Sequence, residues 1–90
     1  MENIFSTRDL YLAATLITLH FKLIGVDFCL EGEKNQPIGY FKFEDSSTLR
    51  EAESSYIQGI LSVEPKTFVG NMRSLKAEVS NIHRNPHLNR

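Results

Sequence analysis

The sequence KLIGVDFCLE, residues 22–31, decides the fold, because its side chains alternate in polarity along the chain. The apolar set is Ile24, Val26, Phe28 and Leu30, and the polar or small set is Gly25, Asp27, Cys29 and Glu31. A period of two is typical of a strand with one buried face. The turn-rich GEKNQP, residues 32–37, and the alternating IGYFKFE, residues 38–44, follow it. Together these segments predict an antiparallel β-hairpin.

The segment before the hairpin has helical spacing instead. Apolar residues recur every three or four positions over residues 6–20, and Ser6 or Thr7 can cap the start of this helix. The uncharged part, residues 10–21, is twelve residues long, whereas about 20 are needed to cross a bilayer. We therefore predict a buried helix, and we expect no association with a membrane.

Two more helices are predicted after the hairpin. The first begins at residues 45–47 and ends near residue 60, and the second begins at Pro65 and ends before Asn85-Pro86. The apolar stripe of the second consists of Phe68, Met72, Leu75, Val79 and Ile82. These residues lie three or four positions apart, which indicates an amphipathic helix with one face in the core.

These elements predict a single small α+β domain, residues 1–85, in the order α-β-β-α-α, with the antiparallel β-hairpin packed on the helices. Residues 86–90 are predicted to be a flexible tail. A two-stranded sheet has two open edges and is marginally stable by itself. We therefore expect a homodimer in which two hairpins form a larger, four-stranded sheet. Dimerisation through helices and a capped monomer remain open alternatives.

Charge is distributed unevenly along the chain, although the net charge is only −1. Residues 1–65 carry ten acids and five cations, a net of −5, and residues 66–90 carry one acid and five cations, a net of +4. This asymmetry indicates an interaction surface. The single cysteine, Cys29, allows no internal disulfide, so we expect a reducing, cytoplasmic setting.

The third predicted helix has a basic face, formed by Lys66, Arg73, Lys76 and Arg84. These residues fall within about one quadrant of a helical wheel, roughly opposite the apolar stripe. Such a face can bind the phosphates of a nucleic acid or an acidic partner, and it can equally be an ordinary solvated face. Asn71, which lies close to it in the sequence, could add a hydrogen bond.

The sequence contains no recognisable catalytic set, and we predict that the protein is not an enzyme. Cys29 has carboxylates nearby in Asp27 and Glu31, which disfavour a reactive thiolate. His83 and His87 are four residues apart, but Pro86 lies between them, so we predict no metal site. We also expect no cofactor.

Tyr40 and Lys42 are candidate partner contacts. Alternation places both side chains on the face of the second predicted strand that points away from the core. An aromatic side chain on an outer sheet face is a typical contact residue in a protein interface.

Several short motifs carry a resemblance to a known family. They are FSTRDLYLA at residues 5–13, GVD at 25–27, YFKFED at 40–45, EPKTF at 64–68 and Leu75-Lys76. With this pattern the chain resembles a small uncharacterised family, classified only as a domain of unknown function, in bacteria, archaea and their phages. The resemblance covers almost the whole chain. It implies a compact domain in a prokaryotic or phage setting, and it brings no activity, cofactor or binding residue.

Together these observations predict a small non-catalytic binding protein, an adaptor or inhibitor that acts by protein–protein interaction. The alternative is an accessory protein that binds nucleic acid through the basic face of the third helix. A strong dependence of binding on salt concentration would favour the second function, because nucleic-acid binding releases counterions.

Overall fold

The computed structural model describes residues 3–34 and 36–84, with residues 36–37 and 81–84 described by their backbone alone. The elements are β1 (Ile4–Thr7), α1 (Leu10–Thr18), β2 (Leu23–Glu31), β3 (Gln36–Glu44), α2 (Ser47–Gln58) and α3 (Pro65–Arg84). The predicted α+β fold of one small domain is confirmed, with the hairpin formed by β2 and β3. The proposed tail, residues 86–90, lies outside the described residues.

Strand β1 is an element that the sequence analysis missed. It pairs with β3 in an antiparallel register that places Phe5 opposite Phe43, and the sheet order is β1-β3-β2. The hairpin is therefore extended within the chain to three strands, and β3 is the central one. The prediction of a helix from residue 6 is wrong at its start, because residues 4–7 are in the sheet.

Helix α1 begins at Leu10 because Asp9 caps it, not Ser6 or Thr7 as predicted. The carboxylate of Asp9 accepts hydrogen bonds from the backbone N–H groups of Tyr11 and Leu12, at 3.0 and 3.2 Å. These groups have no acceptor inside the helix, so the cap stabilises the first turn. The hydroxyl of Tyr56 in α2 also donates to Asp9, over 3.1 Å, which fastens α2 to the start of α1.

The end of α1 forms a Schellman motif around a residue that is not glycine. His20 has a φ of 75°, its N–H donates to the carbonyl of Ile17, and the N–H of Phe21 donates to the carbonyl of Leu16. Gly59 ends α2 in the same way, also with a φ of 75°. The left-handed conformation suits glycine and strains other residues, so the two hydrogen bonds at this helix end form at a cost in backbone strain at His20.

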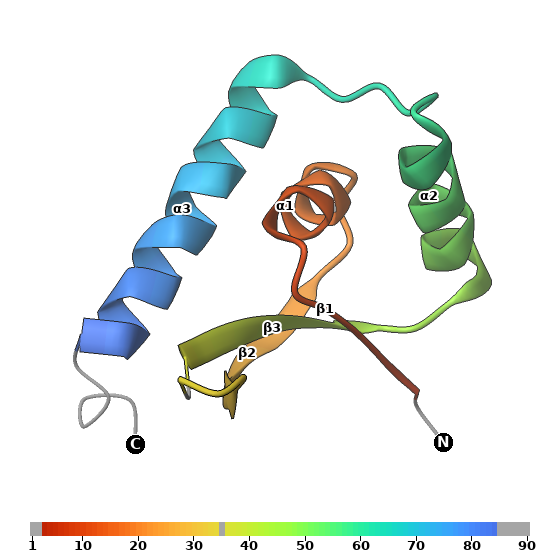
Figure 1. Cartoon of the computed structure of the whole chain (residues 1–90). Coiled ribbons are helices and arrows are strands. Elements are labelled where there is room, and N and C mark those ends of the chain that lie inside the picture. Colours follow the sequence, from red (N-terminus) through yellow and green to blue (C-terminus); the bar gives the residue numbers. More distant parts are fainter. Residues whose placement is uncertain (1–2, 35, 85–90) are drawn as a thin grey trace.

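Helix α1 lies over the sheet, with α3 on one side of it and α2 on the other (Figure 1). Its small residues Ala13 and Ala14 are fully buried, so the neighbouring elements approach its backbone closely. The core is completed by Leu16, Phe43 and Leu49, which come from α1, β3 and α2 and are also fully buried. The prediction that this helix is buried is confirmed.

Strand β2 departs from strict alternation at its start. The register of its pairing with β3 shifts between Leu23 and Gly25, which is a bulge. Ile24 consequently lies half exposed, although alternation predicted it on the core face. Val26 and Phe28 are partly buried as predicted, whereas Leu30 near the end of the strand is exposed.

Candidate interaction surface on α3

Helix α3 presents one apolar side to the rest of the protein and one basic side to solvent. Leu75 is buried, and Phe68, Met72 and Val79 pack against the core, mainly at α1. At the start of α3, the carboxylate of Glu64 accepts hydrogen bonds from the N–H groups of Lys66 and Thr67, at 3.0 and 2.8 Å. These bonds cap the helix, and they lower the pKa of Glu64 below its ordinary value.

The predicted basic face is exposed where the structure describes it. Lys66, Arg73 and Lys76 are all exposed side chains. Arg84 is the last residue of α3, and its side chain lies outside the described part. The amide of Asn71 does not join the basic face, because it donates to the hydroxyl of Thr18 at the end of α1 over 3.0 Å. That expectation of the sequence analysis is corrected: Asn71 fastens α3 to α1.

None of these three cations has an acidic partner within 4 Å among the described side chains. Three of the five other cations whose side chains the structure describes do have one. The pairs are Arg8 with Glu31 at 3.4 Å, Lys42 with Asp27 at 3.0 Å, and Arg50 with Asp45 at 2.9 Å and with Glu53 at 3.3 Å. Lys22 and Lys34, which lie elsewhere on the surface, resemble the α3 cations in this respect. Of the five described cations without an ion pair, three thus lie on α3.

The basic face also contains two residues without charge, Val69 and Gly70. Lys66, Val69, Gly70 and Arg73 follow the spacing of one helix face, and with Pro65 they line a shallow hollow of about 340 Å³. A Cβ atom at Gly70 would meet nothing within 4 Å. Packing within the chain therefore does not require glycine here, although a mid-helix glycine costs about 1 kcal/mol relative to alanine.

The other candidate contacts, Tyr40 and Lys42, lie on the outer face of the sheet, as alternation predicted. The hydroxyl of Tyr40 donates to the carboxylate of Glu31, and this hydrogen bond raises the pKa of Tyr40 above 10.0. Lys42 donates to Asp27. Both polar ends are therefore engaged within the protein. Lys42 also lies on the central strand, so it is not at a sheet edge, as it would be in the two-stranded sheet that the sequence predicts.

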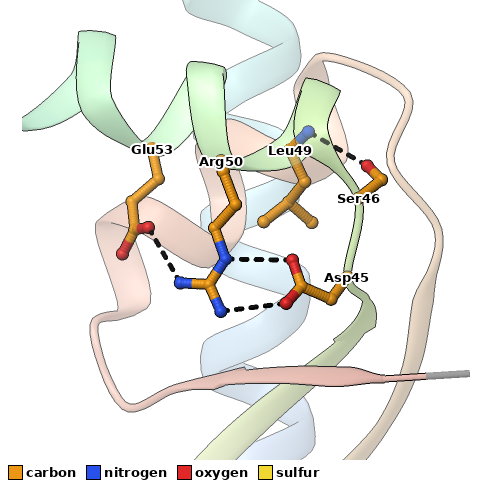
Figure 2. A network of polar contacts seen from close by, with 5 residues as sticks. All are labelled: Asp45, Ser46, Leu49, Arg50 and Glu53. Atoms are coloured by element: carbon orange, nitrogen blue, oxygen red, sulfur yellow. Dashed lines mark hydrogen bonds and ion pairs between the residues drawn. The ribbon is translucent and has the colours of Figure 1, made fainter.

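A second polar network lies where β3 leads into α2 (Figure 2). Arg50 donates to both carboxylate oxygens of Asp45 at 2.9 Å, and its guanidinium lies 4.8 Å from the centre of the Phe5 ring. The hydrogen bond from Arg50 lowers the pKa of Asp45. The hydroxyl of Ser46 caps α2 by accepting from the N–H of Leu49 at 3.0 Å. This network joins the end of β3 to α2 and covers the buried ring of Phe5, which indicates a structural role.

Cys29 is an exposed free thiol on β2, opposite Ile38 of β3. Among the residues that the structure describes, no group of three potential ligands is placed to hold a metal ion. His87 lies outside the described residues, and the side chain of His83 is not described either. The expectations of no metal site, no cofactor and no catalysis stay predictions.

Comparison with known proteins finds no matching family model, no matching curated protein and no matching solved structure. The resemblance to a domain of unknown function therefore stays a prediction from the motifs. In the described part of the chain, no helix combines the length and the apolar character that crossing a bilayer demands.

Proposed function

We propose that this protein is a small non-catalytic binding protein, an adaptor or inhibitor, that recognises an acidic surface of another protein through α3. The observation that carries the proposal is the set of exposed cations Lys66, Arg73 and Lys76, which have no ion pair among the described side chains. Opposite charge on a partner would accelerate association and fix its orientation.

The stability of the helix does not explain Lys66 or Gly70. Lys66 lies in the first turn of α3, where the helix dipole disfavours positive charge by a few tenths of a kcal/mol. Gly70 likewise weakens the helix without an evident packing reason. A partner whose backbone or side chains approach α3 closely at Gly70 accounts for both residues.

The mixture of apolar and cationic side chains on α3 favours a protein over a nucleic acid as the binding partner. Val69, 41% exposed, lies between Lys66 and Arg73, and such a mixture of apolar and cationic groups is common in protein interfaces. The acidic remainder of the chain, with a net of −5 over residues 1–65, repels a polyphosphate. An acidic protein surface presents fewer charges and is repelled less.

Nucleic-acid binding is the second candidate function, and the same unpaired cations favour it. It is tested by mobility shift with short mixed DNA and RNA at two salt concentrations. Binding that weakens steeply with salt and is lost in Arg73→Glu/Lys76→Glu supports this candidate over the first. Absence of a shift at low salt contradicts it.

The proposed protein-binding function is tested by charge reversal in a capture experiment from a prokaryotic lysate treated with nuclease. Lys66→Glu/Arg73→Glu should lose a protein that the wild-type chain retains. The matched control is Lys22→Glu/Lys34→Glu, which makes the same change of charge at exposed residues outside α3. Equal capture by both double variants would contradict a role for the basic face.

We also propose that the protein forms a homodimer, now through β2 rather than through a bare hairpin. Strand β1 covers part of one side of β3, so β2 is the long edge of the sheet, with nine residues. Its exposed side chains Ile24 and Leu30 support pairing with a second copy.

The exposed thiol of Cys29 supports a cytoplasmic setting, because free thiols persist in reducing compartments.

A further inference from the structure

Strand β3 is longer than the strand that covers it. Strand β1 pairs only with residues 41–44 of β3, whereas β2 pairs with residues 36–43 on the other side. After Thr7 the chain turns into α1, so residues 38–40 have no strand neighbour on the β1 side within the described structure. Their backbone forms a short open edge beside the C-terminal half of α3 (Figure 1).

A pocket of about 390 Å³ lies at this open edge, between β3, the start of α1 and α3. Its apolar lining includes Leu10, Phe41 and Val79. Gly39 also lines it, and a Cβ added to this residue would come within 3.6 Å of Val79. The volume falls within the range of about 300–1,000 Å³ that is usual for ligand pockets.

Two cations, Arg8 and Lys76, line the same pocket from different elements. Lys76 has no ion pair among the described side chains. Arg8 contacts Glu31 through a single nitrogen at 3.4 Å, and both side chains are substantially exposed. Such a pair contributes at most weakly to stability, so an incoming anion can compete for Arg8. Apolar side chains and two cations therefore line the same pocket.

We infer that this pocket binds the carboxyl-terminal end of a partner polypeptide. The extended backbone of the peptide pairs with the open edge of β3 at residues 38–40, as an added strand. Its last apolar side chain enters the pocket against Phe41 and Val79, and its terminal carboxylate lies between Arg8 and Lys76. The three parts of such a peptide match the three features of this site. Its backbone matches the open strand edge, its last side chain matches the apolar lining, and its carboxylate matches the two cations.

The inference rests on the proposed protein-binding function only in requiring a polypeptide partner. The two sites share Lys76 and otherwise differ, because Lys66 and Arg73 do not line this pocket. The capture experiment probes Lys66 and Arg73, whereas the peptide titration below probes the edge at Gly39 and Tyr40. The two proposals can therefore fail separately.

The test is a titration of ¹⁵N-labelled full-length protein with a peptide pool, followed by backbone amide chemical shifts. The probe is a pool of N-acetylated pentapeptides with four randomised positions and a final Val, Leu or Phe that bears a free carboxylate. Every member shares a backbone that can extend, an apolar last residue and a terminal carboxylate. We expect saturable shifts at Gly39 and Tyr40. The same pool with amidated ends should bind at least about tenfold more weakly.

Two exposed lysines supply a matched pair of variants. Lys76→Gln should weaken binding about tenfold, because it removes a charge from the pocket. Lys22→Gln makes the same change at an exposed residue outside the pocket and outside α3, and it should leave peptide binding unchanged. N-acetyl-leucine, which has the carboxylate and the apolar side chain but no extended backbone, should bind more weakly than the pool.

Three results would overturn the inference. They are equal binding of the free-acid and amidated pools, equal effects of Lys22→Gln and Lys76→Gln, and absence of shifts at Gly39 and Tyr40. Shifts confined to residues 66–73 would assign the peptide to the basic face instead. Equal affinity for N-acetyl-leucine would identify a small organic acid as the ligand and contradict strand addition.

Discussion

The ring of Phe5 lies opposite Phe43 across the β1–β3 pair, and both side chains are buried. Phe43 is fully enclosed, and Phe5 is covered by the guanidinium of Arg50 from α2. This pair joins the first strand of the chain to the centre of the sheet. It therefore links residues that are 38 positions apart in the sequence.

The first prediction concerns Phe5. Phe5→Ala should lower the free energy of unfolding by about 3–5 kcal/mol, because it leaves a cavity between β1, β3 and α2. The measurement is urea denaturation followed by circular dichroism. Ile4→Ala is the control in the same strand, since Ile4 is 46% exposed, and it should cost clearly less. Equal costs for the two variants would contradict the burial of Phe5.

The second prediction separates the two sides of α3. Leu75→Ala should lower the free energy of unfolding by about 2–5 kcal/mol, because Leu75 is buried against the core. Val69→Ala on the outer side should change it by less than about 1 kcal/mol. An unchanged denaturation midpoint for Leu75→Ala would show that α3 is not part of the core.

The third prediction concerns the two helix ends with positive φ. His20→Gly should raise the free energy of unfolding by about 0.5–1 kcal/mol, because it relieves a left-handed residue that is not glycine. Gly59→Ala should lower it by about 1 kcal/mol, since it imposes the same strain on α2. Both values follow from denaturation curves. A less stable His20→Gly protein would mean that the histidine ring contributes packing that exceeds the strain.

The fourth prediction is a pH dependence that originates at Asp45. The hydrogen bonds from Arg50 hold the pKa of Asp45 below its ordinary value of 3.8. Between the folded and unfolded pKa values the unfolded chain binds more protons, so this contribution to stability is present above pH 3.8. It is lost as the pH falls through the lower, folded pKa.

Asp45→Asn should therefore be less stable than the wild-type protein near neutral pH, and the two should converge in acid. The measurement is the denaturation midpoint as a function of pH. Glu51→Gln is the control, because Glu51 is an exposed carboxylate on α2 with no ion pair among the described side chains. A constant difference between wild type and Asp45→Asn across this range would contradict the ion pair.

The fifth prediction concerns the proposed dimer. Ile24→Lys/Leu30→Lys should convert a dimer into a monomer, because lysine on an edge strand disfavours pairing with another chain. Both residues are at least half exposed, so the fold should survive. The measurement is the mass in solution by light scattering, with Ile4→Lys on the other edge as control. A dimer that persists in the double variant would point to contacts between helices.

The sequence predicts five of the six elements because each has a clear period within its own residues. The strand β1 could not be predicted in this way. Its four residues are too few to show alternation, and Ser6 and Thr7 resemble a helix cap. Its place depends on Phe43, far away in the sequence. The bulge at Ile24 is similarly a property of the pairing between two strands rather than of one.

The two candidate surfaces also differ in whether the sequence alone can predict them. The basic face of α3 follows from helical spacing alone, and the exposed Lys66, Arg73 and Lys76 agree with it. The pocket at Gly39 does not, because it exists only where β3 extends beyond β1 and α3 passes beside it. Arg8 and Lys76 are 68 residues apart in the sequence, and no local pattern brings them together.

The most direct test of binding through α3 is site-specific photocrosslinking from position 77. With Cys29→Ser as background, Ala77→Cys carries a thiol-linked benzophenone at an exposed residue next to Lys76, one helical turn beyond Arg73 and two beyond Gly70. Thr48→Cys, exposed on α2, is the control. We predict that a protein partner is crosslinked from position 77 and not from position 48. Crosslinking from position 48 alone, or equally from both, would contradict the assignment of the basic face as the binding surface.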